Sequence, residues 1–186
     1  MNIYEHFATY DVLPVRLRDV RDQILETGHV NRIIRVPVTF RDFIISGGFH
    51  RFRDLAPYAS GQVVALIGYP DNLPEPLQRV IQVKEMLHVL DPDMATSPTK
   101  AKVDALIDDL MVEEAERAVG IPAQYDHRGL LHAMCILLPR GALDIIRPIY
   151  KRDGCTLDEV AEWANLPKPL VQIALRDSWR ETIETI

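Results

Sequence analysis

The chain has 186 residues, of which 47% are hydrophobic and 26% are charged, and its formal net charge is −6. This composition fits one folded domain, or one domain with a small appendage, and excludes a chain that is disordered by composition. The negative charge argues against a DNA-binding face over much of the surface, although it leaves room for a local basic patch.

The two cysteines, Cys135 and Cys155, lie in different segments and form neither a paired metal-binding spacing nor a disulfide framework. The N-terminal residues lack the basic and apolar regions of a signal peptide. No window approaches the run of about 18 uncharged apolar residues that a transmembrane helix needs. We therefore expect a cytoplasmic protein that does not cross or bind a membrane.

The first forty residues predict an arm, a helix and a strand. Residues 1–10 predict an irregular arm, and an apolar stripe over residues 13–25 predicts a helix that Gly28 ends. Residues 33–40 are rich in β-branched side chains and predict a strand. Pro37 cannot donate to a strand ladder, so it indicates an edge position or a bulge. The arginines around this helix predict a solvent-facing surface: Arg16, Arg18, Arg21 and Arg32.

A second strand is predicted shortly before the most informative helix. Residues 46–48, Ser-Gly-Gly, predict a turn. Residues 62–67 are nearly all apolar and predict a strand, which ends at the turn signal of residues 68–72. Together with residues 33–40, this strand predicts a small sheet.

Residues 78–91 predict a helix with one buried apolar face. Glu85 and His88 are three residues apart, so they lie on one surface of that helix, one turn apart. A carboxylate and an imidazole in this arrangement suit metal binding or proton transfer. The same spacing is also common where a surface glutamate precedes a half-buried histidine.

The remaining segments predict further helices. One begins at Ser97 and ends at Gly120, with an acidic flank that faces solvent. Residues 126–138 predict a buried helix with Asp126 at its start, and residues 143–150 continue helically.

The C-terminal segment predicts a helix pair. Thr156 and Glu159 have the spacing of a capping box, which opens a helix over residues 157–164, and a second helix follows over residues 170–179. This pair resembles a helix-turn-helix unit. Its second helix would present a DNA-contacting face: Lys168, Gln172 and Arg176. Residues 140–186 carry seven Lys and Arg against eight Asp and Glu, which is thin support for binding phosphates.

The helix of Glu85 and His88 resembles the zinc helix of the ImmA/IrrE family of metallopeptidases, whose pattern is Arg-Phe-x-x-Ala-His-Glu-x-x-His. Arg79 matches the arginine, Glu85 the general base and His88 the second histidine. Lys84 stands where the family has its first zinc-binding histidine.

A second segment carries the resemblance further. Residues 136–139, Ile-Leu-Leu-Pro, match the end of the family's Glu-x-x-Ala-x-x-Phe-Ala-x-x-Leu-Leu-Met-Pro segment. This alignment places Asp126 at the third zinc ligand, which is normally glutamate, Gly129 where alanine is usual, and His132 where phenylalanine is usual.

The resemblance implies an α+β fold with two parts. Residues 1–140 would form a mainly helical, zincin-like core with a small β-sheet, and residues 141–186 would form a C-terminal helical appendage with the helix-turn-helix-like element. It also implies a prophage or stress-response regulator that cleaves or engages a helix-turn-helix repressor.

The replacement at Lys84 decides the expected chemistry. A thermolysin-like site needs two imidazoles, a carboxylate between them and a third ligand, so the loss of one imidazole predicts that no zinc is held. The Lys84 ammonium would instead pair with Glu85 and Asp126 and replace part of the metal's charge. Three alternatives stay open: Lys84 points to solvent, Asp126 caps its helix, or His132 completes a site for zinc, iron or manganese.

Three functional hypotheses follow. The first is a regulatory protein with a degenerate metallopeptidase fold, which binds a protein partner such as a helix-turn-helix transcription regulator without zinc hydrolysis. The second is an active metal-dependent peptidase with a non-standard site. The third is a DNA-binding regulator that uses residues 156–179.

Overall fold

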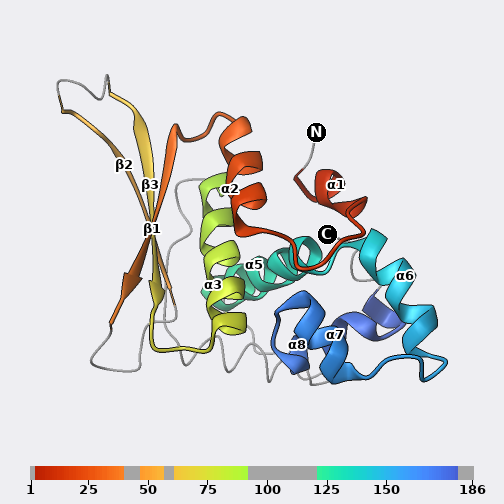
Figure 1. Ribbon diagram of the computed structural model, residues 1–186. Helices are drawn as coiled ribbons and strands as arrows, with labels where there is room; N and C mark the ends of the chain where they lie inside the picture. Colours follow the sequence, from red (N-terminus) through yellow and green to blue (C-terminus); the bar gives the residue numbers. More distant parts are fainter. Residues whose placement is uncertain (1–2, 40–46, 57–60, 92–120, 180–186) are drawn as a thin grey trace.

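The computed structural model describes residues 3–39, 47–56, 61–91 and 121–179. Its architecture is α+β: a small sheet lies on the left in Figure 1, and the helices lie to its right. The predicted α+β class with a small sheet is therefore confirmed. The helix predicted between Ser97 and Gly120 lies outside the described residues.

The sheet has the strand order β1-β3-β2. Strands β1 (Arg32–Val38) and β3 (Val63–Pro70) run parallel, whereas β2 (Gly48–Arg53) runs antiparallel to β3. In the described sheet β1 is an outer strand, so Pro37 occupies the edge strand that its missing N–H predicts.

Two predictions for the sheet are wrong at their boundaries. Gly48 is the first residue of β2 and not part of a turn, because it pairs with Gly68 of β3. Gly68 also pairs with Val36 of β1, so β3 continues to Pro70 and the turn begins only at Asp71. Pairing with one strand at Gly48, and with two strands at Gly68, outweighs the turn preference of these glycines.

The N-terminal segment forms two helices. Helix α1 (Ile3–Ala8) replaces the predicted irregular arm, because it buries Ile3 and Phe7 and packs against a later helix, α5. Helix α2 (Leu17–Glu26) begins later than the apolar stripe indicates. The predicted end at Gly28 is confirmed, since this glycine has a φ of 77°, a conformation that costs glycine little.

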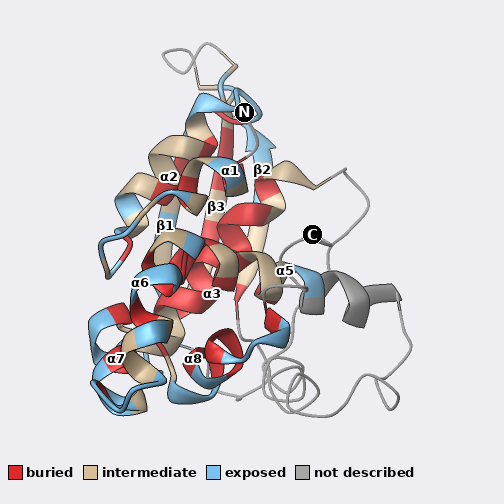
Figure 2. Ribbon diagram, turned by 90° about the vertical axis from the view of Figure 1, so that its right-hand side faces the viewer, coloured by how far each residue is buried: buried red, intermediate tan, exposed pale blue. Residues whose placement is uncertain are grey.

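Helix α3 (Glu75–Leu87) lies at the centre of the molecule and continues as a 3-10 turn, η1 (His88–Leu90). This confirms the helix predicted over residues 78–91. Helix α3 contacts α2, β3 and α5 at once, and every residue from 79 to 87 is buried (Figure 2). The single buried face predicted from its periodicity is therefore too narrow.

Helices α5 (Ile121–Leu137) and α6 (Arg140–Tyr150) follow. None of the described helices is by itself long and apolar enough to cross a membrane, and α5 and α6 meet that test only as a pair bent by 75°.

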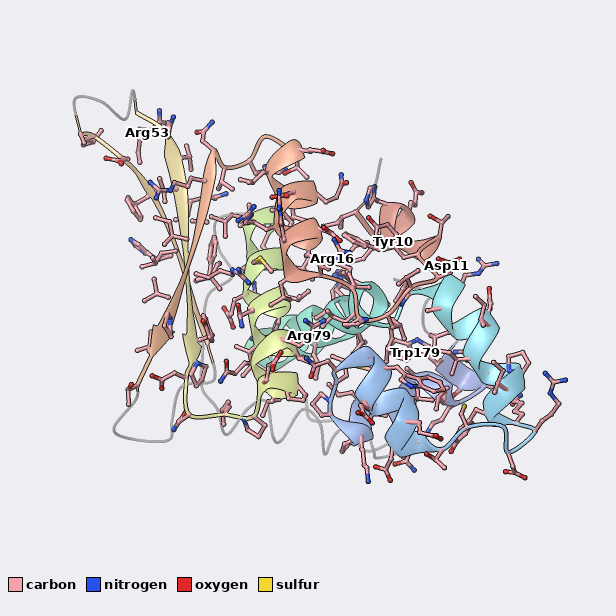
Figure 3. The ribbon with its side chains drawn as sticks, in the orientation of Figure 1. Tyr10, Asp11, Arg16, Arg53, Arg79 and Trp179 are labelled. Atoms are coloured by element: carbon pink, nitrogen blue, oxygen red, sulfur yellow. The ribbon has the colours of Figure 1, made fainter. Side chains whose placement is uncertain are left out.

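Helix α7 (Leu157–Ala164) has the predicted bounds, and its capping box is present. The Glu159 N–H donates to Thr156 Oγ1 at 3.2 Å, and the Thr156 N–H donates to Glu159 Oε2 at 2.7 Å. Helix α8 (Lys168–Leu175) ends four residues before the predicted end at Trp179. Trp179, labelled in Figure 3, is buried.

The buried apolar side chains form one connected cluster. It contains Phe7 of α1, Met86 of α3, Leu137 of α5, Leu170 of α8 and Trp179. The core therefore joins residues from both sides of the boundary predicted near residue 140.

Candidate functional site

Among the described residues, the buried polar and charged side chains all lie on α3. They are Arg79, Gln82, Lys84 and Glu85, with exposed fractions of 8, 6, 3 and 2%. A buried charge is costly unless it is paired or hydrogen-bonded, so α3 carries groups whose burial needs an explanation. Two of them, Lys84 and Glu85, contact each other, whereas Arg79 and Gln82 line a groove.

Lys84 and Glu85 form a buried ion pair. The Lys84 Nζ lies 3.1 Å from the Glu85 Oε1, and both side chains are 3% exposed. Oε1 accepts no well-aligned hydrogen bond from the described residues, so the contact with Lys84 is ionic. The alternative in which Lys84 points to solvent is wrong, because α3 is buried on all sides here.

Two glycines enclose this pair. A Cβ added at Gly47, just before β2, would lie 2.7 Å from the Glu85 Oε1, and a Cβ at Gly129 of α5 would lie 3.2 Å from the Lys84 Cγ. Real Cβ atoms essentially never come as close as the first distance, and the second is tight. The missing side chain at Gly129 therefore leaves space for the lysine stem, at the position where the ImmA/IrrE pattern has alanine.

His88 lies next to the ion pair and is oriented by Asp91. Its Nδ1 lies 2.6 Å from the Asp91 Oδ2, and its Nε2 lies 4.0 Å from the Glu85 Oε2. The ring of Phe49 on β2 packs 6.1 Å from the His88 ring, centroid to centroid. Metal-binding histidines usually hold their second ring nitrogen against a carboxylate in this way.

Sequence reasoning treated Asp91 only as the end of a helix. The three-residue spacing from His88 to Asp91 is the signal that could have identified the contact, because residues three apart are neighbours on one helix surface.

His132 of α5 lies in a different set of contacts. Its Nδ1 bonds the Tyr4 hydroxyl, and its Nε2 accepts from the Arg128 Nε at 3.5 Å. Burial, helped by Arg128, lowers the pKa of His132 to about 4, so the ring is neutral at pH 7. Both ring nitrogens have partners, and a metal would have to displace one of them.

No group of three His, Cys, Asp or Glu residues within the described ranges is arranged to hold a metal ion. Asp126, the predicted third ligand, lies in α5, but its side chain is outside the described part of the chain. Helix α5 begins at Ile121, so the alternative in which Asp126 caps this helix is wrong.

The predicted DNA-contacting residues lie apart from this site. Lys168 and Gln172 are exposed on α8, and the Lys168 ammonium pairs with the Asp158 carboxylate of α7. Arg176 lies beyond the end of α8 in extended backbone, so the prediction that it continues this helix face is wrong. The Cys135 thiol is also an unsuitable nucleophile, because burial raises its pKa to about 12.

Comparison of the sequence with known protein families and with curated proteins, and of the structure with solved structures, found no match. A functional proposal for this chain therefore depends on its own residues and their geometry.

Proposed function

We propose that this chain is a cytoplasmic regulatory protein with a zincin-like core, which has lost zinc hydrolysis and binds a protein partner such as a helix-turn-helix transcription regulator. One observation carries the proposal. The Lys84 ammonium lies buried against Glu85, at the position where the ImmA/IrrE pattern has its first zinc-binding histidine.

Charge explains why this arrangement favours a metal-free site. In a zinc peptidase the cation lies beside the general-base carboxylate and activates a water molecule. Here an ammonium lies 3.1 Å from that carboxylate. A divalent cation held by Glu85 and His88 would meet the lysine charge at short range in a buried environment, where repulsion is strong.

The surroundings support an inherited scaffold. The His88 Nδ1 contacts the Asp91 carboxylate, as the second ring nitrogen of a metal-binding histidine usually contacts a carboxylate. The His88 Nε2 faces the Glu85 carboxylate. The antiparallel strand β2 passes beside it through Phe49 and is an outer strand of the described sheet. A free strand edge beside the site can pair with an extended segment of a partner.

The metal content of the purified chain tests this proposal. We expect much less than one zinc, iron or manganese ion per chain. We also expect no chelator-sensitive hydrolysis of denatured casein. One zinc per chain that is lost in His88→Ala would instead support the active peptidase. A salt-dependent mobility shift of DNA that Arg176→Ala weakens would support the DNA-binding regulator and contradict the proposal.

A further inference from the structure

The other two buried polar residues of α3, Arg79 and Gln82, line a groove. The groove has a volume of about 650 Å³ and is bounded by α2, β1 and α3. Four arginines line it, and we call it the arginine groove: Arg21, Arg32, Arg35 and Arg79. Glu75 is the one acidic residue in its lining, so the groove is cationic in a chain whose net charge is −6.

Within the described part of the chain, three of these arginines have no direct carboxylate partner. Arg35 donates to the Gln82 Oε1 at 3.2 Å, and Arg32 has no hydrogen-bonding or ionic partner among the described residues. Arg21 differs, because its guanidinium donates to the Asp22 carboxylate at 2.7 Å.

Arg79, labelled in Figure 3, is the buried member of the set. Its Nη2 donates to the Val15 carbonyl oxygen at 2.7 Å, whereas its Nε has no hydrogen-bond partner among the residues that the structure describes. Glu75 offsets part of this charge electrostatically, but its own Oε1 accepts from the Asn165 Nδ2 at 2.8 Å. Positive charge in the groove is therefore only partly compensated.

The shape of the groove indicates an extended ligand. Five successive residues of the β1 segment, 31–35, line it. Successive side chains of a strand point to opposite faces of its sheet, so a surface lined by all five follows the edge of the strand. In the described sheet β1 pairs only with β3, so no described strand pairs with its other edge.

We propose that the arginine groove binds an extended peptide segment with acidic side chains, which pairs as an additional strand along β1. Strand addition supplies backbone hydrogen bonds, and the arginines supply charge-assisted hydrogen bonds to carboxylates. A nucleic acid has no peptide backbone to pair with a strand edge. This site is separate from the Lys84–Glu85 pair and does not depend on the function proposed for that pair.

Fluorescence anisotropy with a labelled peptide of alternating threonine and glutamate tests the proposal at low ionic strength. We expect binding of this peptide and none of its lysine counterpart. Arg32→Glu and Arg35→Glu, both at exposed positions of β1, should each lower the affinity about tenfold, the order expected for one charge-assisted hydrogen bond. Arg152→Glu makes the same charge change on the exposed turn after α6 and should leave the affinity within about twofold.

A second peptide tests strand pairing separately from charge. This peptide has the same sequence but carries methyl groups on alternate backbone nitrogens. It retains the glutamates and lacks half of the backbone hydrogen-bond donors, so it should not bind. The proposal would be overturned if the methylated and unmethylated glutamate peptides bind equally well. It would also be overturned if all three variants lose affinity equally, or if a single-stranded DNA oligonucleotide competes as effectively as the unlabelled peptide.

Discussion

Removal of the Lys84 ammonium should strongly destabilise the fold. In Lys84→Met the stem is kept but Glu85, 2% exposed, loses a cation 3.1 Å from its Oε1. At that distance the attraction is about 5 kcal/mol for an effective dielectric constant of about 20, and part of it only offsets the desolvation of the two groups. Measured losses for breaking a buried pair support a decrease of about 3–5 kcal/mol in the free energy of unfolding.

Urea denaturation followed by circular dichroism measures this loss, and Lys151→Met provides a matched control. The Lys151 Nζ lies 2.6 Å from the Asp177 Oδ1, closer than in the buried pair, but the two side chains are 57% and 81% exposed. Because water and salt screen an exposed pair, the control should lose no more than about 1 kcal/mol. Burial, rather than distance, should therefore decide which lysine matters.

The double variant Lys84→Met/Glu85→Leu completes the test. It removes both charges, so it should be more stable than Lys84→Met alone. A loss below about 1 kcal/mol in Lys84→Met, or equal losses in Lys84→Met and Lys151→Met, would refute the reasoning.

Three further substitutions test the surroundings. Gly47→Ala places a Cβ 2.7 Å from the Glu85 Oε1 and should lower the free energy of unfolding by about 1–3 kcal/mol. Gly129→Ala should cost less, because its Cβ meets only the flexible side chain of Lys84. Equal losses in the two variants would contradict the close approach at Gly47. Thr156→Ala removes the capping box of α7 and should cost about 1 kcal/mol; an unchanged denaturation midpoint would show that the cap contributes nothing. His132 has a pKa lowered from 6.5 to about 4, so the unfolded chain binds a proton there that the folded chain does not, and stability should fall as pH drops from about 6.5 to about 4. His132→Gln should flatten this part of the stability profile, and an unchanged slope would contradict the assignment.

Local signals in the sequence were sufficient for several elements. Thr156 and Glu159 identified the start of α7 because a capping box is made by residues three apart. Gly28 marked the end of α2, and Pro37 indicated an edge strand because its ring removes a backbone donor. In each case the physical cause lies within a few residues of the element.

Elements stabilised by distant partners were missed or misplaced. Strand β2 has arginine at positions 51 and 53 and no clean apolar alternation, and it forms by pairing with β3. Helix α1 is too short to be stable alone and depends on packing against α5. The contact of Gly129 with Lys84 joins residues 45 positions apart, so no local pattern shows that one makes room for the other.

The sequence predicted which residues form the candidate site but not all of their contacts. The sequence indicated the Lys84–Glu85 pair and His88, yet treated Asp91 only as a helix end. It also treated Arg21 and Arg32 as part of a solvated surface, because the groove arises only when β1, α2 and α3 come together.

Zinc binding by the Lys84→His variant tests most directly whether the lysine ammonium stands in the place of a metal. This substitution restores the second imidazole of the family pattern beside Glu85 and His88 and removes the cation that would repel a metal. Calorimetric titration with zinc should show one site in the variant and none in the wild-type chain or in Lys84→Met. Zinc binding by the wild-type chain, or none by Lys84→His when it is folded, would contradict this interpretation of Lys84.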